Sequence, residues 1–276
     1  MRKLWKTLER INSRMISTTT IGPKEEPYPM IANVWDFFSQ KGTKTVFVSV
    51  GTGNTCLPDL DFAETIGCPL LKVDTPEKTI QEWNEIKDIL KTRKTTETTS
   101  EFVKAAARKW VLPKNIYIQR CVPSLYNGTL DTQEGPIPTK KWYDLVAEHC
   151  KQIGLPEGDI HIDILKLDIC DYQDSTLFSL WQTGFRPSLL LIHWNNSPDS
   201  NLTTLLSAGH LQMIGYSLVA KEGNRFLYYY TDTNYYETCS WETPAKRFEN
   251  PFVSNLVKAV YPGTENTSIL HFPVAK

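Results

Sequence analysis

The stretch VFVSVGTGNTCLPD, residues 46–59, decides the fold of this chain. Its first half is an uninterrupted apolar run of the kind found in strands buried inside parallel sheets. The run leads into Gly51, Thr52 and Gly53, where the backbone N–H groups of a nucleotide-binding fold approach their ligand. Two features depart from that pattern: Ser49 stands where an acid is expected, and no third glycine follows. The stretch therefore predicts a cofactor-type turn with fewer anchors than usual.

Strand and helix patterns alternate along the rest of the chain. Apolar runs that predict strands recur at residues 68–74, 115–121, 160–168 and 187–194. Apolar positions spaced by three and four predict helices over residues 77–90, 102–112, 140–154, 174–185 and 201–215. Residues 216–231 predict a β-hairpin around a Gly-Asn turn. This order predicts one α/β domain with a largely parallel sheet, helices on both faces and a C-terminal antiparallel hairpin.

Both ends of the chain and one internal break fall outside this alternation. Residues 1–29 suggest a basic arm and linker, and residues 236–276 a tail that wraps an α/β domain at 30–235. The Gly- and Pro-rich stretch at 126–138 is too long for a simple connector, so it is interpreted as either disordered or a lid over a site. The arm predicts a docking helix or a frayed arm, with a transit peptide as the alternative, and a helix there could dock on a membrane or on a protein partner.

Composition narrows the classes of function. The 276 residues are 41% hydrophobic and 22% charged, and a formal net charge of −1 gives no reason to expect nucleic acid or an acidic membrane as the main partner. No apolar run reaches the roughly 18 residues that a transmembrane helix needs. Six scattered cysteines without metal-type spacing predict buried thiols in a reducing compartment and no metal site. We therefore expect a cytoplasmic protein without a transmembrane segment.

Three polar side chains stand where predicted strands end. Asp74 closes the second strand, Asp168 the fourth and His193 the fifth. Because ligands of open parallel sheets bind at the carboxyl ends of the strands, we expect these residues to share an edge with the glycine turn. A carboxylate at Asp74 could accept hydrogen bonds from ribose hydroxyls. Each of these features also has a structural explanation. The glycines could form a simple tight turn, the acid at Asp74 could cap the following helix, and His193 could be a hydrogen-bonded structural residue.

The predicted sheet with its closing hairpin resembles the fold of S-adenosylmethionine-dependent methyltransferases. Within that class the chain resembles the FkbM-type group most. IDILKLDICDYQ at 162–173 is similar to the group's phrase hDhLKhDhEGhE, where h is apolar, and TGFRPSLLLIHW at 183–194 is similar to its next turn and strand. VSVGTGNT at 48–55 and DTPE at 74–77 stand where the group has VDVGANxG and EP. The resemblance covers roughly residues 40–232.

Several positions depart from the FkbM-type pattern. Ser49 replaces an Asp that helps to hold the turn and the cofactor, and Thr55 replaces a closing glycine. The fourth-strand phrase has lost its Glu-Gly-Glu signature, and His193 replaces a usual Glu; the other replacements are Cys170, Asp171 and Gln173. The loss of these acids favours a domain that kept the fold and lost the chemistry, whereas the retained Asp74 and Asp168 favour an enzyme.

The resemblance implies S-adenosylmethionine as cofactor. We expect Gly51, Thr52 and Gly53 to contact its methionine part and Asp74 to hold its ribose hydroxyls. Asp168 would lie near the acceptor or the amino group of the cofactor.

His193 is the candidate base, because an ordinary histidine titrates near neutral pH. The implied reaction is O-methylation of a sugar hydroxyl or small metabolite, with a small-molecule or glycan acceptor. The alternative is a catalytically inactive methyltransferase-like domain that acts as a binding or structural protein. A glycosyltransferase ranks third, because no DxD motif follows a predicted strand.

Overall fold

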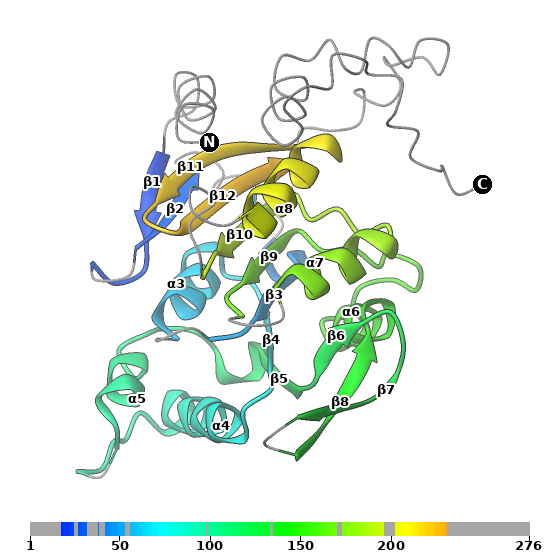
Figure 1. The fold of residues 1–276 in the computed structure, drawn as a ribbon. Coiled ribbons are helices and arrows are strands. Elements are labelled where there is room, and N and C mark those ends of the chain that lie inside the picture. The colour runs from blue at the N-terminus through cyan, green and yellow to red at the C-terminus, as the bar shows by residue number, and fades with distance from the viewer. Residues whose placement is uncertain are drawn as a thin grey trace, which may run out of the picture.

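A computed structural model of the chain describes most of the segment between residues 18 and 230 (Figure 1). The described residues are 18–24, 27–31, 38, 42–52, 56–97, 99–132, 135–169, 173–195 and 202–230. The predicted N-terminal docking helix and C-terminal tail lie outside these residues, and the proposed domain limits stay predictions. Within the described residues no helix is both long and apolar enough to cross a bilayer.

A seven-stranded sheet forms the centre of the molecule and confirms the predicted fold class. Its order is β5-β4-β3-β9-β10-β12-β11. The bounds are β3 Phe47–Val50, β4 Leu70–Asp74, β5 Ile116–Arg120, β9 Ile164–Leu167, β10 Leu189–His193, β11 Tyr216–Glu222 and β12 Arg225–Tyr230. The first five strands along the chain pair in parallel, and β12 runs antiparallel to both β10 and β11. In chain order the strands stand 3-2-1-4-5-7-6, which is the class I methyltransferase-like arrangement.

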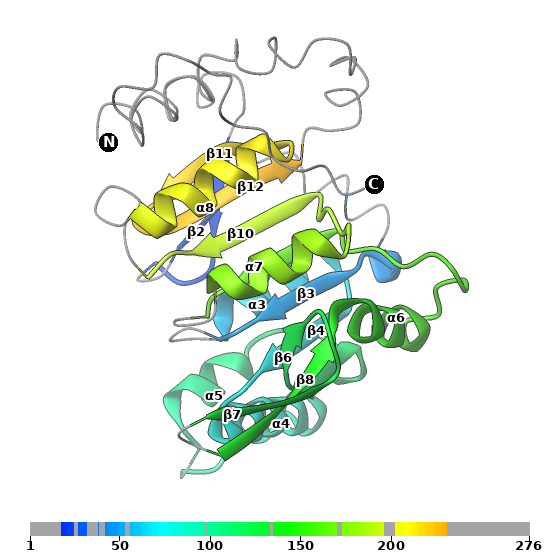
Figure 2. The same ribbon diagram turned by 45° about the vertical axis from the view of Figure 1, so that its right-hand side comes forward.

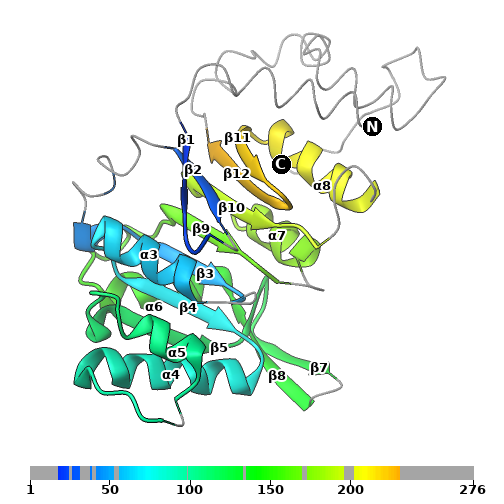
Figure 3. The same ribbon diagram turned by 90° about the vertical axis from the view of Figure 1, so that its left-hand side faces the viewer.

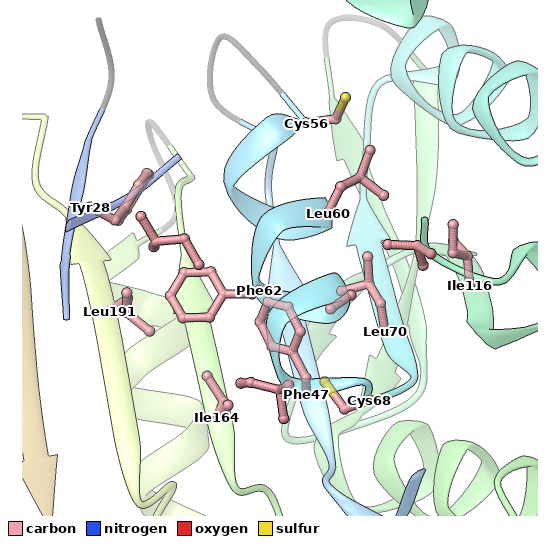
Figure 4. Packing of buried hydrophobic residues seen from close by; sticks show 14 of the residues in the cluster. Tyr28, Phe47, Cys56, Leu60, Phe62, Cys68, Leu70, Ile116, Ile164 and Leu191 are labelled. Atoms are coloured by element: carbon pink, nitrogen blue, oxygen red, sulfur yellow. The ribbon is translucent and has the colours of Figure 1, made fainter. Parts of the chain in front are cut away.

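Helices cover both faces of the sheet, because its central strands are apolar on both sides. Val48 and Val50 of β3 point to one face, where they join a buried cluster with side chains of α6, α7 and α8. Phe47 points to the other face and joins a cluster with side chains of α3, α4 and α5. The bounds are α3 Leu57–Ile66, α4 Glu77–Thr92, α5 Glu101–Ala106, α6 Trp142–Gln152, α7 Gln173–Gln182 and α8 Leu202–Met213, with short 3₁₀ turns η1 Gly42–Lys44 and η2 Pro113–Asn115. Figure 2 shows α7 and α8 against one face of the sheet. On the other face the rings of Phe47 and Phe62 meet with centroids 5.5 Å apart (Figure 4).

Residues 18–21 and 28–31 form a small antiparallel sheet, whereas residues 18–29 were predicted to be a linker. β1 (Thr18–Ile21) pairs with β2 (Tyr28–Ile31). Ile21, Tyr28 and Met30 are buried, so the hairpin has an apolar face that a linker would lack. Strand β2 packs against β11 and β12 at the far end of the central sheet (Figure 3).

The interpretation of residues 126–138 as disorder is wrong for the part that the structure describes, whereas the alternative of a lid over a site stays a prediction. β7 (Gly128–Thr132) and β8 (Gly135–Lys141) form an antiparallel pair, and β6 (Val122–Ser124) adds to β8 in parallel. Ile137 is buried under this three-stranded sheet and gives it an apolar anchor. The glycines and prolines therefore mark a folded insertion between β5 and α6.

Candidate functional site

The structure brings the predicted site residues to one edge of the sheet. Gly51 and Thr52 follow β3, Asp74 ends β4, Asp168 follows β9 and His193 ends β10. These four strands are parallel, so their carboxyl ends meet at one edge (Figure 3). Gly53, the last predicted residue of the turn, lies outside the described residues.

Gly51 has a structural task that differs from the predicted one. Its φ is +75°, and a Cβ atom built on it would lie 2.1 Å from the carbonyl oxygen of Asp168. Its N–H donates to the carbonyl oxygen of Val73 over 2.9 Å. The glycine therefore lets the end of β3 pass close to the end of β9, and its amide is already used within the sheet.

Thr52 and Asp74 form a polar pair at the ends of the first two parallel strands. The Thr52 hydroxyl donates to Asp74 Oδ2 over 2.6 Å and accepts from Trp83 Nε1 over 3.1 Å. Asp74 Oδ1 accepts from the N–H of Thr75 over 2.9 Å. A carboxylate offers about four acceptor positions, so these two bonds leave capacity for a ligand. Asp74 is 8% exposed, which places it just below the surface.

Asp168 and His193 form a hydrogen-bonded dyad. The distance from His193 Nδ1 to Asp168 Oδ1 is 2.9 Å, and the Tyr28 hydroxyl donates to Asp168 Oδ2 over 2.5 Å. Burial by itself would raise the pKa of Asp168, but Lys166 and the hydrogen bonds from His193 and Tyr28 outweigh it and hold that pKa well below its usual range. The carboxylate therefore stays charged beside a histidine whose side chain is 26% exposed.

Tyr28 is a site residue that the sequence did not reveal. It comes from β2, lies 140 positions from Asp168 in the chain and is 1% exposed. Two cationic groups lie over its ring: Lys166 Nζ and the guanidinium carbon of Arg225 are each 5.1 Å from the ring centroid. Burial, together with the negative charge of Asp168, raises the pKa of the Tyr28 hydroxyl, so it acts as a donor. No local pattern in TTTIGPKEEPYP pointed to this contact.

A buried ionic cluster lies beneath the turn. Ser49 stands in register with Lys72 on β4 and Lys166 on β9, so the three side chains share the face that α3 covers. Asp59 of α3 lies 3.1 Å from both lysine nitrogens. Ser49 Oγ donates to Asp59 over 2.9 Å, and Lys72 Nζ donates to Ser49 Oγ and to the carbonyl oxygen of Gly51.

Asp59 supplies a carboxylate where the acid at position 49 is missing. It is fully buried, as are Lys72 and Lys166, and through Lys72 it is linked to the backbone of the glycine turn. Burial lowers the pKa of Lys72, whereas the carboxylates of Asp59 and Asp168 raise that of Lys166 despite its burial. Lys166 lies within 4 Å of two carboxylates, Asp59 and Asp168, and Lys72 within 4 Å of one, Asp59. The acid missing from β3 is thus replaced by one from the following helix.

Metal chemistry finds no support in the described residues, where no group of three or more His, Cys, Asp or Glu side chains could hold an ion. The sequence prediction of no metal site stays a prediction for the whole chain.

No protein-family model matches the chain, and no curated protein matches it. The FkbM-type resemblance therefore stays a prediction. Among solved structures, fibrillarin from Methanococcus jannaschii, a pre-rRNA processing protein, is similar at 10% identity and TM-score 0.38, over 79% of this chain and 84% of that one. The methyltransferase domain of METTL16 is similar at 11% identity and TM-score 0.38, over 83% and 80%.

A putative tRNA methyltransferase from Streptococcus pneumoniae is similar at 10% identity and TM-score 0.35, over 83% of each chain. Likenesses this distant carry no functional argument, so the class assignment rests on the strand order.

Proposed function

We propose that this chain is an S-adenosylmethionine-dependent methyltransferase that methylates a hydroxyl group of a small molecule or glycan. The observation that carries the proposal is the edge of a 3-2-1-4-5-7-6 sheet where Asp74 stands on one side of the central strand β3 and the Asp168–His193 dyad on the other. In such folds ligands bind at this edge, where the strand order reverses on the two sides of β3.

The described residues fit the cofactor in part. Asp74 would accept hydrogen bonds from the ribose hydroxyls, since its oxygens keep acceptor positions beyond the bonds from Thr52 and Thr75. The amide of Gly51 would not contribute, because it is bonded to Val73. When bound, the sulfonium cofactor supplies an electrophilic methyl group and needs no covalent intermediate on the protein.

His193 would remove the proton of the acceptor hydroxyl. The Asp168 carboxylate holds Nδ1 of His193, which leaves Nε2 as the basic nitrogen of the neutral ring. As the ring takes up the proton, the charged Asp168 stabilises the resulting imidazolium. A base held in this way contributes about 10²- to 10⁴-fold to such a step.

Calorimetry on the full chain with S-adenosylmethionine and S-adenosylhomocysteine tests the cofactor. Asp74→Ala should weaken binding by more than about tenfold, because it removes charge-assisted hydrogen bonds. Asp131→Ala, at an exposed acid of β7, is the matched control and should leave binding unchanged. Affinity that is the same in both variants would remove Asp74 from the site.

An acceptor panel then tests the reaction. Sugars and small hydroxyl compounds should accept the methyl group, and His193→Gln should slow transfer by about 10²-fold or more while leaving cofactor affinity in place. An RNA oligonucleotide belongs in the same panel. Methylation of RNA alone would overturn both the expected acceptor class and the expectation of no nucleic-acid partner.

One observation favours a second function, that of a methyltransferase-like domain without chemistry. The Gly51 amide, the Thr52 hydroxyl and both oxygens of Asp168 are already engaged inside the protein. A domain that binds or organises other proteins would need no open cofactor site. Absence of any heat or thermal stabilisation with either cofactor form at millimolar concentration would select this alternative.

A further inference from the structure

A shallow depression of about 480 Å³ lies at the edge of the sheet opposite the candidate site. It is lined by Lys87, Asp88, Lys91, Leu112, Pro113 and Lys114. Helix α4 starts after the carboxyl end of β4 and runs back, so its last turns reach the amino edge. The 3₁₀ turn η2 directly precedes β5 and packs against α4, which places the other lining residues at the same edge.

This part of the chain is strongly basic. Residues 87–114 hold eight Lys or Arg and three Asp or Glu, a net charge of +5 in a chain whose formal net charge is −1. Lys104 pairs with Glu101, and Lys109 pairs with Asp61 and Glu64. Among the described residues, in contrast, none of the ion pairs involves Lys87, Lys91 or Lys114. Their charges are therefore available to an anionic partner.

Two large apolar side chains stand beside these lysines. Trp110 is 79% exposed and Leu112 is 51% exposed. Arg93, at the end of α4, holds the loop in place by donating to the carbonyl oxygens of Ala107 and Lys109 over 3.2 and 2.5 Å. Its guanidinium also lies over the Trp110 ring at 5.1 Å. Trp110 is thus held in an exposed position by an anchored loop, close in sequence to the exposed Leu112.

We propose that this basic face, formed by Lys87, Lys91, Arg93, Trp110, Leu112 and Lys114, binds the surface of a membrane that carries anionic lipids. Lysines attract anionic headgroups, and a tryptophan with an adjacent leucine suits the boundary between headgroups and acyl chains. The candidate site at the opposite edge would then face away from the lipid, where cofactor and acceptor arrive from solution.

The features of the face favour a membrane over nucleic acid. Leu112 and Pro113 offer a base neither an aromatic ring nor a hydrogen-bonding side chain, whereas an exposed leucine suits the boundary between headgroups and acyl chains. One face of Trp110 is already covered by Arg93. The sequence of the N-terminal arm has the same chemistry, since residues 1–14 hold five Lys or Arg and one Glu beside Leu4, Trp5 and Leu8. Two such segments fit the need of peripheral proteins for more than one weak anchor.

Co-sedimentation of the full chain with vesicles tests the proposal. The protein should bind vesicles of phosphatidylcholine with about one third phosphatidylserine, bind pure phosphatidylcholine weakly, and be released by high salt. Lys91→Glu/Lys114→Glu should weaken binding by at least about 25-fold, since each basic residue near such a surface contributes about fivefold. Lys78→Glu/Lys151→Glu changes the net charge equally at exposed positions away from this face, and should reduce binding less than about fivefold.

Leu112→Ser separates lipid from RNA, because it removes an inserting side chain and no charge. It should weaken vesicle binding severalfold and leave the thermal melting of the protein unchanged. Failure to prefer anionic vesicles would overturn the proposal, as would equal losses in the two double variants. Binding of a single-stranded RNA that Lys91→Glu/Lys114→Glu abolishes, with no vesicle binding, would assign the face to nucleic acid instead.

Discussion

Asp59 is the residue on which the buried ionic cluster depends, and Asp59→Asn tests that role. The substitution keeps the shape of the side chain but removes the negative charge 3.1 Å from both Lys72 and Lys166. Lys166 keeps Asp168 at 3.6 Å, so the main orphan is Lys72, which retains only its bonds to Ser49 and to the Gly51 carbonyl. A buried charge that loses its partner costs about 3–5 kcal/mol, and we expect that loss in the free energy of unfolding.

Urea unfolding followed by tryptophan fluorescence measures the effect. Asp61→Asn is the matched control on the same helix, because its pair with Lys109 is partly exposed and should contribute about 1 kcal/mol or less. Removing both partners in Asp59→Leu/Lys72→Met should recover more than about half of the loss, since no orphaned cation remains. A loss below about 1 kcal/mol in Asp59→Asn, or no recovery in the double variant, would refute the account of the cluster.

Three further predictions concern single residues. Burial lowers the pKa of His149 to about 4, whereas a histidine of the unfolded chain takes up its proton near pH 6.5. The free energy of unfolding should therefore be full at neutral pH and fall by about 3 kcal/mol as the pH drops from 6.5 to 4. His149→Gln should remove this dependence on pH when unfolding is measured by urea titration across that window. Tyr28→Phe removes a donor to Asp168 and should cost about 1–3 kcal/mol in thermal or urea unfolding and lower the turnover number without changing cofactor affinity, and an unchanged turnover number would separate Tyr28 from the dyad. Gly51→Ala should destabilise the protein by at least about 2 kcal/mol, because the new Cβ would meet the Asp168 carbonyl. Gly154→Ala is the control, since Gly154 has a similar φ of +78° but no atom within 4 Å of such a Cβ, and it should cost about 1 kcal/mol. Equal losses in the two variants would show that only the φ angle matters.

The sequence predicted every strand of the central sheet because each one is a run rich in apolar residues between breakers, even where Ser49, Lys72 or Lys166 interrupts it. Buried strands need such runs on both faces, so the signal is local and strong. Helix α3 was not predicted. It starts at Leu57–Pro58, directly after the glycine turn, and its apolar pattern did not stand out from that turn. The insertion β6–β8 was misread because its glycines and prolines resemble those of a loop, while its two buried residues in the described part, Pro123 and Ile137, leave little apolar pattern.

For the candidate site, too, the sequence predicted the positions of the residues but not their contacts. Gly51, Thr52, Asp74, Asp168 and His193 could be placed at one edge from sequence, because the carboxyl ends of parallel strands coincide. Their roles as cofactor and acceptor residues stay predictions, as does the contribution of Gly53.

What the sequence determined by itself was the order of the strands of the central sheet along the chain, and with it the edge where polar side chains gather. Only the tertiary structure decided how those side chains are held. Tyr28 reaches Asp168 from 140 positions away, and Asp59 replaces a missing acid by lying over the strand that lost it. Periodicity along the chain reports which face of an element is buried, but it carries no information on which distant element brings the partner. That choice is made when the helices and the N-terminal hairpin pack against the sheet and every buried charge must find an opposite one.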